Sequence, residues 1–141
     1  LTFPFLTYLN KIQFSSVSDY VTDHAFNFWT LVVGLDKVSD STLFLGISYY
    51  QYGLAFFTLL IGLVLYLLRK KMDFARVSLA NSLIAFAAFL FLTRMHERHL
   101  EAVLPFLLLA GVKNRNVLTV FLIVSVFHFA NIYHNWWFPR I

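Results

Sequence analysis

The 141-residue sequence contains no cysteine, and only 13% of its residues are charged. The absence of cysteine excludes a disulfide framework and any metal site with cysteine ligands. The scarcity of charge separates the chain from soluble globular domains, in which about 25% of residues are charged. Nucleophile-elbow, Walker and dinucleotide-binding motifs are also missing from the sequence, so none of the enzyme classes that use them is indicated.

The residues that are abundant are those of a membrane protein. Hydrophobic residues make up 60% of the chain, the mean hydropathy is +0.71, and 17 residues are phenylalanine. The formal charge of +4 comes from basic residues at the ends of apolar runs. This position favours membrane topology over nucleic-acid binding. We therefore expect an integral, multi-pass membrane protein with membrane lipid, and no nucleic acid, among its partners.

Long apolar runs predict an all-α, polytopic transmembrane helix bundle over residues 47–141. Each residue of a helix advances about 1.5 Å, so about 20 residues cross the hydrocarbon core. The third run is short and contains Pro105, which favours a kinked, short or re-entrant element. The predicted spans, about four in number, cover residues 47–68, 77–93, 100–112 and 117–132.

The loops between these runs predict the orientation of the bundle. Arg69, Lys70 and Lys71 lie between the first two spans, and Lys113 and Arg115 lie between the last two. Basic loops face the cytoplasm in most membrane proteins. The start of the first span and the end of the second are therefore expected on the extracytoplasmic side.

Residues 1–46 form a separate unit in this interpretation. Residues 1–9 are apolar but have no basic segment and no small-residue cleavage site, so they do not resemble a signal peptide. We interpret them as the end of a preceding span, and the chain as the C-terminal portion of a longer protein. The amphipathic stretch from Val17 to Val33 predicts an outer interfacial or re-entrant helix, followed by a polar turn at residues 36–41.

The segment Thr93–His99 concentrates charge between two uncharged runs. Charge inside hydrocarbon costs about 2.5–3.5 kcal/mol per residue even on mild insertion scales. The segment must therefore lie at a membrane surface or in a water-filled cavity, where chemistry is most easily placed. Its ionisable residues are Arg94, His96, Glu97, Arg98 and His99.

Two interpretations of this segment start from its charges. As one turn of helix, it would place Arg94 near Glu97 and Arg98 near Glu101, and the charges would neutralise each other. As an anion site, its arginines would bind phosphate oxygens and its histidines would donate or transfer protons, with Glu97 fixing one arginine. The depth of the segment suits the phosphate of a lipid-linked sugar.

A metal site is the third interpretation. His96 and His99 could share an ion with Glu97 or His24, but the zinc-peptidase spacing of two histidines is absent. We therefore assign no metal ligand. Five further polar residues could line the same cavity, although hydrogen bonding between helices or a solvated helix face would also explain them. They are Asp23, His24, Asn27, His128 and Asn131.

Three segments together resemble one family. Residues 91–110, FLTRMHERHLEAVLPFLLLA, resemble the MHERYL-x-P-A-L-P segment of prokaryotic multi-spanning glycosyltransferases related to the second mannosyltransferase of GPI-anchor assembly. Residues 25–29 (AFNFW) resemble the family's AFNLW, and residues 40–49 resemble its DS-x-x-FLGLSY. The matches occur in the family's order, between about residues 23 and 110. His99 and Glu101 depart from the pattern, which has an aromatic and a small or apolar residue there.

The resemblance implies a GT-C-type hexosyltransferase. Such enzymes transfer a sugar, often mannose, from a polyprenyl- or dolichyl-phosphate donor on the extracytoplasmic side. Their catalytic base is an acidic residue near the N-terminus, which would lie on the missing N-terminal portion. This chain would then supply the donor site, with His96, Glu97 and Arg98 at the matching positions. No cofactor beyond the lipid-linked sugar donor is implied.

Two other functions fit the same pattern of charge. In a transporter or lipid-flipping module, the charged segment would line the substrate path. In a non-catalytic scaffold subunit, it would serve assembly only. The sugar and the acceptor are left open by the sequence.

Overall fold

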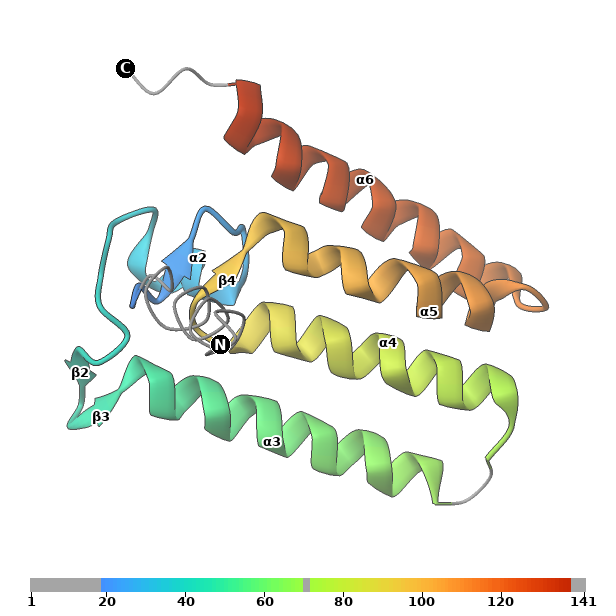
Figure 1. The fold of residues 1–141 in the computed structure, drawn as a ribbon. Helices are drawn as coiled ribbons and strands as arrows, with labels where there is room; N and C mark the ends of the chain where they lie inside the picture. Colours follow the sequence, from blue (N-terminus) through green and yellow to red (C-terminus); the bar gives the residue numbers. More distant parts are fainter. Residues whose placement is uncertain (1–18, 70–71, 138–141) are drawn as a thin grey trace, which may run out of the picture.

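The structure, a computed structural model, describes residues 19–69 and 72–137 (Figure 1). The predicted end of a preceding span at residues 1–9 lies outside the described residues, as do Lys70 and Lys71 of the predicted basic loop. In chain order the elements are β1 (Thr22–Asp23), α2 (Phe28–Val33), β2 (Leu43–Phe44), β3 (Ile47–Ser48), α3 (Tyr49–Leu68), α4 (Phe74–Phe91), β4 (Met95–His96), the 3₁₀ helix η1 (Glu97–Ala102), α5 (Val103–Gly111) and α6 (Arg115–Trp137).

The predicted all-α membrane bundle is confirmed. Helices α3, α4 and α6 are the three that are long and apolar enough to cross a membrane within the described ranges. Consecutive long elements run in opposite directions, and α4 lies between α3 and α5 (Figure 1). The small core is centred on Ala25, Phe89, Leu100, Val103 and Leu107, which come from four segments of the chain.

Polar side chains set where the long helices begin. Ser48 and Gln51 form a reciprocal capping box at the start of α3. Asp73 accepts a hydrogen bond from the backbone N–H of Arg76, so α4 begins at residue 74 rather than at the predicted 77. The side chain of Asn114 accepts from the backbone N–H of Asn116 at the start of α6. Each helix therefore begins at a local hydrogen-bond signal.

The predicted third span is only partly a span. Its α-helical part, α5, has nine residues and is about 14 Å long. With the six residues of η1 before it, the helical segment reaches about 25 Å. Pro105 lies in the first turn of α5, where its missing N–H is not needed, and of the predicted kinked, short or re-entrant elements α5 is a short one. The four predicted spans become three full spans and one shorter element.

The predicted helix over residues 17–33 is also replaced. Within its described part, residues 19–33, only α2 is helical, because residues 21–23 form backbone hydrogen bonds with other segments of the chain. Strand β1 pairs in parallel with β4, and Asn27 caps α2 by accepting from the backbone N–H of Trp29. His24 has a φ of 59°, which no regular helix tolerates. The segment therefore docks onto the end of the bundle as an irregular layer.

The two basic loops lie at one end of the bundle. Arg69 follows α3, Lys113 lies in the turn before α6, and Arg115 is the first residue of α6. Figure 1 shows both loops at the end opposite to β4 and α2. The charged segment 93–99 is thus separated from the basic loops by the length of the helices, as the sequence predicts. The cytoplasmic assignment of the loops stays a prediction.

Candidate functional site

The charged segment is not a turn of α-helix. Helix α4 ends at Phe91, residues 95–96 are extended in β4, and η1 begins at Glu97. Arg94 has a φ of 63°, and its N–H lies 3.2 Å from the carbonyl oxygen of Tyr20 and 3.3 Å from that of Val21. Because this backbone pairs with residues 20–23, the helical spacing needed for an Arg94–Glu97 pair does not exist.

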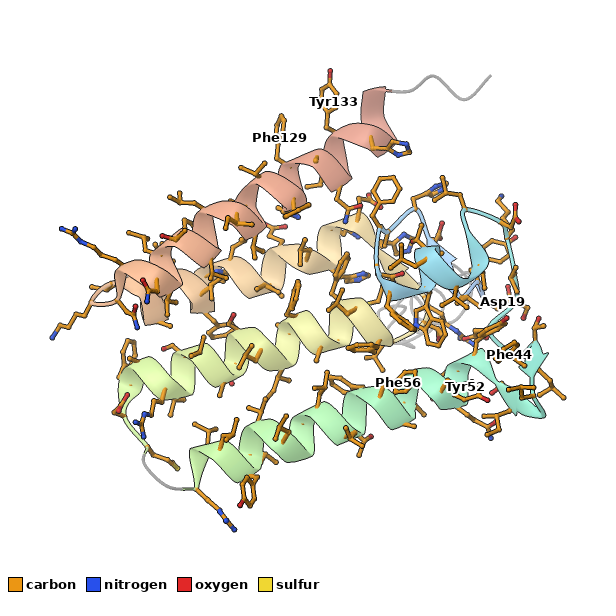
Figure 2. All side chains as sticks on the ribbon, turned by 180° about the vertical axis from the view of Figure 1, so that it is seen from behind. Asp19, Phe44, Tyr52, Phe56, Phe129 and Tyr133 are labelled. Atoms are coloured by element: carbon orange, nitrogen blue, oxygen red, sulfur yellow. The ribbon has the colours of Figure 1, made fainter. Side chains whose placement is uncertain are left out.

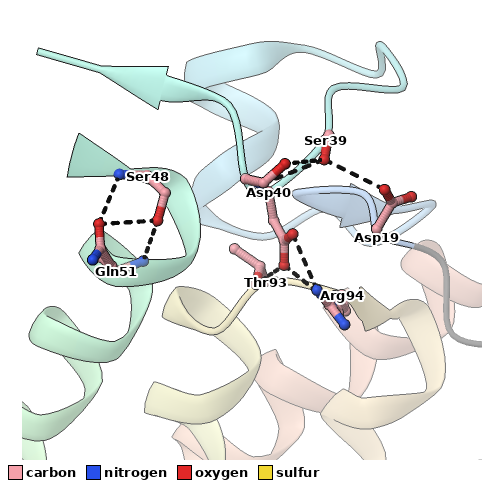
Figure 3. A network of polar contacts seen from close by, with 8 residues as sticks. Asp19, Ser39, Asp40, Ser48, Gln51, Thr93 and Arg94 are labelled. Carbon is pink, nitrogen blue, oxygen red and sulfur yellow. Dashed lines mark hydrogen bonds and ion pairs between the residues drawn. The ribbon is translucent and has the colours of Figure 1, made fainter. Parts of the chain in front are cut away.

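Arg94 is held by a residue that sequence reasoning did not place in the site. Its Nε donates to Asp40 Oδ2 at 2.7 Å, and its Nη2 donates to Asp40 Oδ1 at 3.2 Å (Figure 3). The Thr93 hydroxyl donates to Asp40 Oδ2 at 3.0 Å. Asp40 is only 2% exposed, so three donors compensate for the burial of its charge. The hydrogen bond with Asp40 raises the pKa of Arg94, so the guanidinium stays charged.

A second cluster joins one carboxylate and two histidines. The parallel pairing of β1 and β4 aligns Asp23 with His96. Asp23 Oδ2 lies 3.6 Å from His96 Nδ1, and Asp23 Oδ1 lies 3.5 Å from His24 Nε2. The Asp23 carboxylate thus lies between the two imidazole rings and limits their orientation.

His99 lies next to this cluster as a neutral base. Its Nδ1 accepts a hydrogen bond from the backbone N–H of His96 at 2.8 Å, so its ring proton belongs on Nε2. Partial burial lowers the pKa of His99, and the neighbouring charges of His96 and Arg98 lower it further. His99 is therefore predominantly neutral at pH 7, and its Nε2–H can donate to a ligand.

Glu97 and Arg98 do not pair as expected. Among residues 19–69 and 72–137, neither side chain forms an ion pair, so Glu97 does not fix an arginine. Glu97 Oε2 is buried and has no hydrogen-bond partner in this part of the chain. Arg98 is exposed. The exposed Arg98 is thus accessible to a ligand, whereas Oε2 of Glu97 is enclosed by protein.

The other predicted cavity residues do not line one common cavity. Asn27 is structural, because it caps α2 and its Nδ2 donates to the Phe89 carbonyl at 3.3 Å. Asn131 is buried and accepts from the backbone N–H of Phe26 at 3.1 Å, which ties α6 to the segment before α2. His128 Nδ1 is buried without a partner in the described chain. Asn131 lines a groove, whereas Asp23 and His24 belong to the cluster around His96.

The groove lies between α4, α6 and the segment that precedes α2. Its volume is about 650 Å³, and its surface is almost entirely apolar. At one end, Phe26 packs edge-to-face on His134 with ring centroids 4.6 Å apart. The lining residues are Phe26, Phe86, Phe89, Leu90, Leu100, Val124, Phe127, Ala130, Asn131 and His134. The segments that carry the two polar clusters therefore also contribute to an apolar groove.

No known protein family, curated protein or solved structure matches the chain. Over the described residues, no group of three or more His, Asp or Glu side chains lies close enough to hold a metal ion. Neighbouring segments of the chain carry a charged, hydrogen-bonding cluster and, on other residues, an apolar groove. Such a combination suits an amphiphile that has an anionic head and a hydrocarbon tail.

Proposed function

We propose that this chain is the donor-binding membrane portion of a GT-C-type glycosyltransferase. In this proposal, the donor is a polyprenyl- or dolichyl-phosphate sugar, bound on the extracytoplasmic side. The observation that supports the proposal is that η1 carries an exposed cation and also contributes to an apolar groove. The cation is Arg98, and Leu100 of η1 lines the 650 Å³ apolar groove. The motif resemblance over residues 23–110 supports the sugar chemistry.

The groove and the cations match the two parts of the donor. An isoprenoid chain can pass from the bilayer into an apolar groove between membrane helices and is held there by van der Waals packing. The phosphate needs fixed positive charge, and Arg98 is exposed and forms no ion pair within the described segments. Arg94 donates two of its five side-chain N–H groups to Asp40, and the other three can bind phosphate oxygens. In this proposal, Asp40 orients Arg94 to donate hydrogen bonds to the phosphate. Arg98, which forms no ion pair among the described residues, supplies a positive charge.

The reaction is a displacement at the anomeric carbon. The acceptor hydroxyl oxygen bonds to that carbon as its bond to the phosphate oxygen breaks, and the lipid phosphate leaves with the bonding electrons. The hydroxyl proton passes to a base, which the resemblance places on the N-terminal portion. Arg94 and Arg98 stabilise the charge that grows on the departing phosphate. Nδ1 of His96 faces Asp23, so its Nε2 is the nitrogen that contacts the phosphate or transfers a proton.

Substitution of Arg98 tests the proposal. In the full-length protein, Arg98→Ala should lower sugar transfer from the lipid-linked donor by about 100-fold, the typical cost of losing one group that stabilises transition-state charge. It should also weaken binding of undecaprenyl phosphate, which carries no sugar. Initial rates and lipid binding in detergent micelles measure the two effects.

Arg115→Ala is the matched control. It removes the same charge from an exposed arginine at the opposite end of the bundle. Both variants should insert into the membrane at the wild-type level, and the control should keep its rate and its lipid affinity. Equal behaviour of the two variants in both assays would contradict the proposed role of Arg98.

A further inference from the structure

The β2–β3 hairpin exposes an apolar surface at the same end of the molecule as the charged segment. Leu45, at its tip, is 84% exposed, and Leu31 on the nearby α2 is 86% exposed. Soluble proteins rarely leave such contiguous apolar surface in water. The other large exposed apolar residues of the two segments are Val32, Leu35, Leu43, Phe44 and Ile47.

The backbone conformation of the hairpin tip, together with Leu45, indicates the environment of the tip. Leu45 and Gly46 form a two-residue turn with φ values of 52° and 84°. Turns with two positive φ values favour Asn-Gly, because Asn tolerates this conformation and is well hydrated. Leucine tolerates a positive φ less well than asparagine, and its side chain is poorly hydrated. Its presence at the tip is explained by apolar surroundings.

The hairpin is fixed to α3 and continues its apolar surface. The Tyr52 hydroxyl donates to the Phe44 carbonyl at 3.2 Å, and the Phe44 and Tyr49 rings stack with centroids 6.2 Å apart. Figure 2 shows Phe44 of β2 near the start of α3, with Tyr52 and Phe56 following along the helix. No charged residue occurs from Leu43 to Leu68. The lipid-facing surface of the span therefore runs without interruption onto the hairpin.

Helix packing sets the depth of the hairpin. Gly53 lies directly against the carbonyl of Phe91 at the end of α4, so α3 begins about one turn beyond that level. The hairpin lies just before the start of α3, a helix that is long and apolar enough to cross a membrane. Between the hairpin and α2 lies an aromatic groove of about 300 Å³. Aromatic side chains are enriched at this depth of a membrane. The groove residues are Phe28, Trp29, Val32, Phe44, Leu45, Tyr49, Tyr52 and Phe56.

We propose that the β2–β3 hairpin and the exposed face of α2 insert into the headgroup–hydrocarbon boundary of the leaflet nearest the charged segment. Lipid acyl chains occupy the aromatic groove between them. The backbone N–H of Tyr50 donates to the carbonyl of Asp40 at 3.0 Å, so the inserted hairpin is joined directly to the residue that holds Arg94. The inserted surface thus fixes the height of the charged segment relative to the lipid headgroups.

Spin labels on single cysteines test this placement, since the chain has no cysteine of its own. Leu45→Cys and Leu31→Cys report on the two apolar edges, and the high exposure of both residues means that a label displaces no packing. Leu59→Cys, on the exposed surface of α3, is the lipid reference, and Lys37→Cys, in the exposed polar turn, is the water reference. The protein is reconstituted in phosphatidylcholine–phosphatidylglycerol vesicles.

Collision with oxygen and with a water-soluble nickel chelate distinguishes the outcomes. We expect labels at 45 and 31 to collide more with oxygen than with nickel, although by a smaller ratio than the mid-span label at 59, and the label at 37 to show the reverse. Nickel-dominated collision at 45 and 31 would place these edges in water and overturn the proposal. Low collision with both reagents would show that another protein segment covers the surface, which would overturn it as well.

Discussion

At the scale of single residues, Asp40 determines the geometry of the charged segment. Its buried carboxylate receives Nε and Nη2 of Arg94 and the hydroxyl of Thr93. Arg94 adopts a positive φ, which costs free energy in any residue with a Cβ atom. The bidentate contact with Asp40 offsets that cost and fixes the direction of the guanidinium.

The Asp40→Asn substitution should therefore destabilise the protein while keeping the side-chain shape. An amide removes the negative charge and brings an NH₂ group toward the guanidinium. Breaking a buried ion pair costs about 3–5 kcal/mol. Because the Arg94 side chain is 42% exposed and can be solvated in part, we expect the lower range of about 1–3 kcal/mol. Denaturant unfolding in detergent micelles measures the change.

Asp36→Asn is the control for this substitution. Asp36 lies in the same loop and is exposed, and no side-chain contact is seen for it within the described residues. Its replacement should change the free energy of unfolding by less than about 0.5 kcal/mol. If both variants unfold at the same denaturant concentration, Asp40 does not stabilise the segment as described.

The sequence pattern predicted where the charged segment lies, but it did not predict which side chains its residues contact. Charge between two apolar runs is visible in any sequence, and the structure places Arg94, His96, Glu97, Arg98 and His99 at one end of the bundle. The partner of Arg94, however, lies 54 residues earlier in the chain. Helical spacing suggested Glu97 instead, because spacing rules describe only contacts within one element.

At the scale of elements, the long helices could be predicted and the irregular layer could not. Continuous apolar runs and local caps mark α3, α4 and α6, whose ends differ from the predicted ends by five residues at most. The layer of residues 19–27 depends on pairing between β1 and β4, which are separated by about 70 positions. Such pairing leaves no periodic signal in either segment.

The close contact between α3 and α4 depends on Gly53. A Cβ atom at this position would lie 2.5 Å from the carbonyl oxygen of Phe91 and 3.5 Å from the ring of Trp29. Gly53→Ala should therefore push the helices apart and cost about 1–3 kcal/mol of stability. A lower midpoint of thermal unfolding in detergent would report this loss.

Gly62→Ala, on the same helix, separates the steric effect from helix propensity. No atom lies within 4 Å of a Cβ built at Gly62. Alanine favours the helix more than glycine does, so this variant should match or slightly exceed the wild type. A Gly53→Ala variant as stable as Gly62→Ala would show that the two helices can separate without cost.

At the scale of the whole molecule, charge is divided between the two ends of the bundle. The basic turns next to α3 and α6 lie at one end, together with Asp73, and the charged segment with its partner Asp40 lies at the other. The proposed transfer reaction requires the second end to face outward. An enzyme of this kind keeps one fixed orientation, whereas a transporter exposes its substrate path to each side in turn.

Two exposed positions outside the proposed site test the orientation, again because the chain has no native cysteine. Glu101→Cys reports on the end with the charged segment, and Lys113→Cys on the basic end. In intact cells or right-side-out vesicles, a membrane-impermeant maleimide should label position 101 at once and position 113 only after permeabilisation. This pattern should not change when undecaprenyl phosphate is added. Labelling of 113 from outside would invert the topology and place the phosphate site in the cytosol, and lipid-dependent exchange of the two accessibilities would favour transport over transfer.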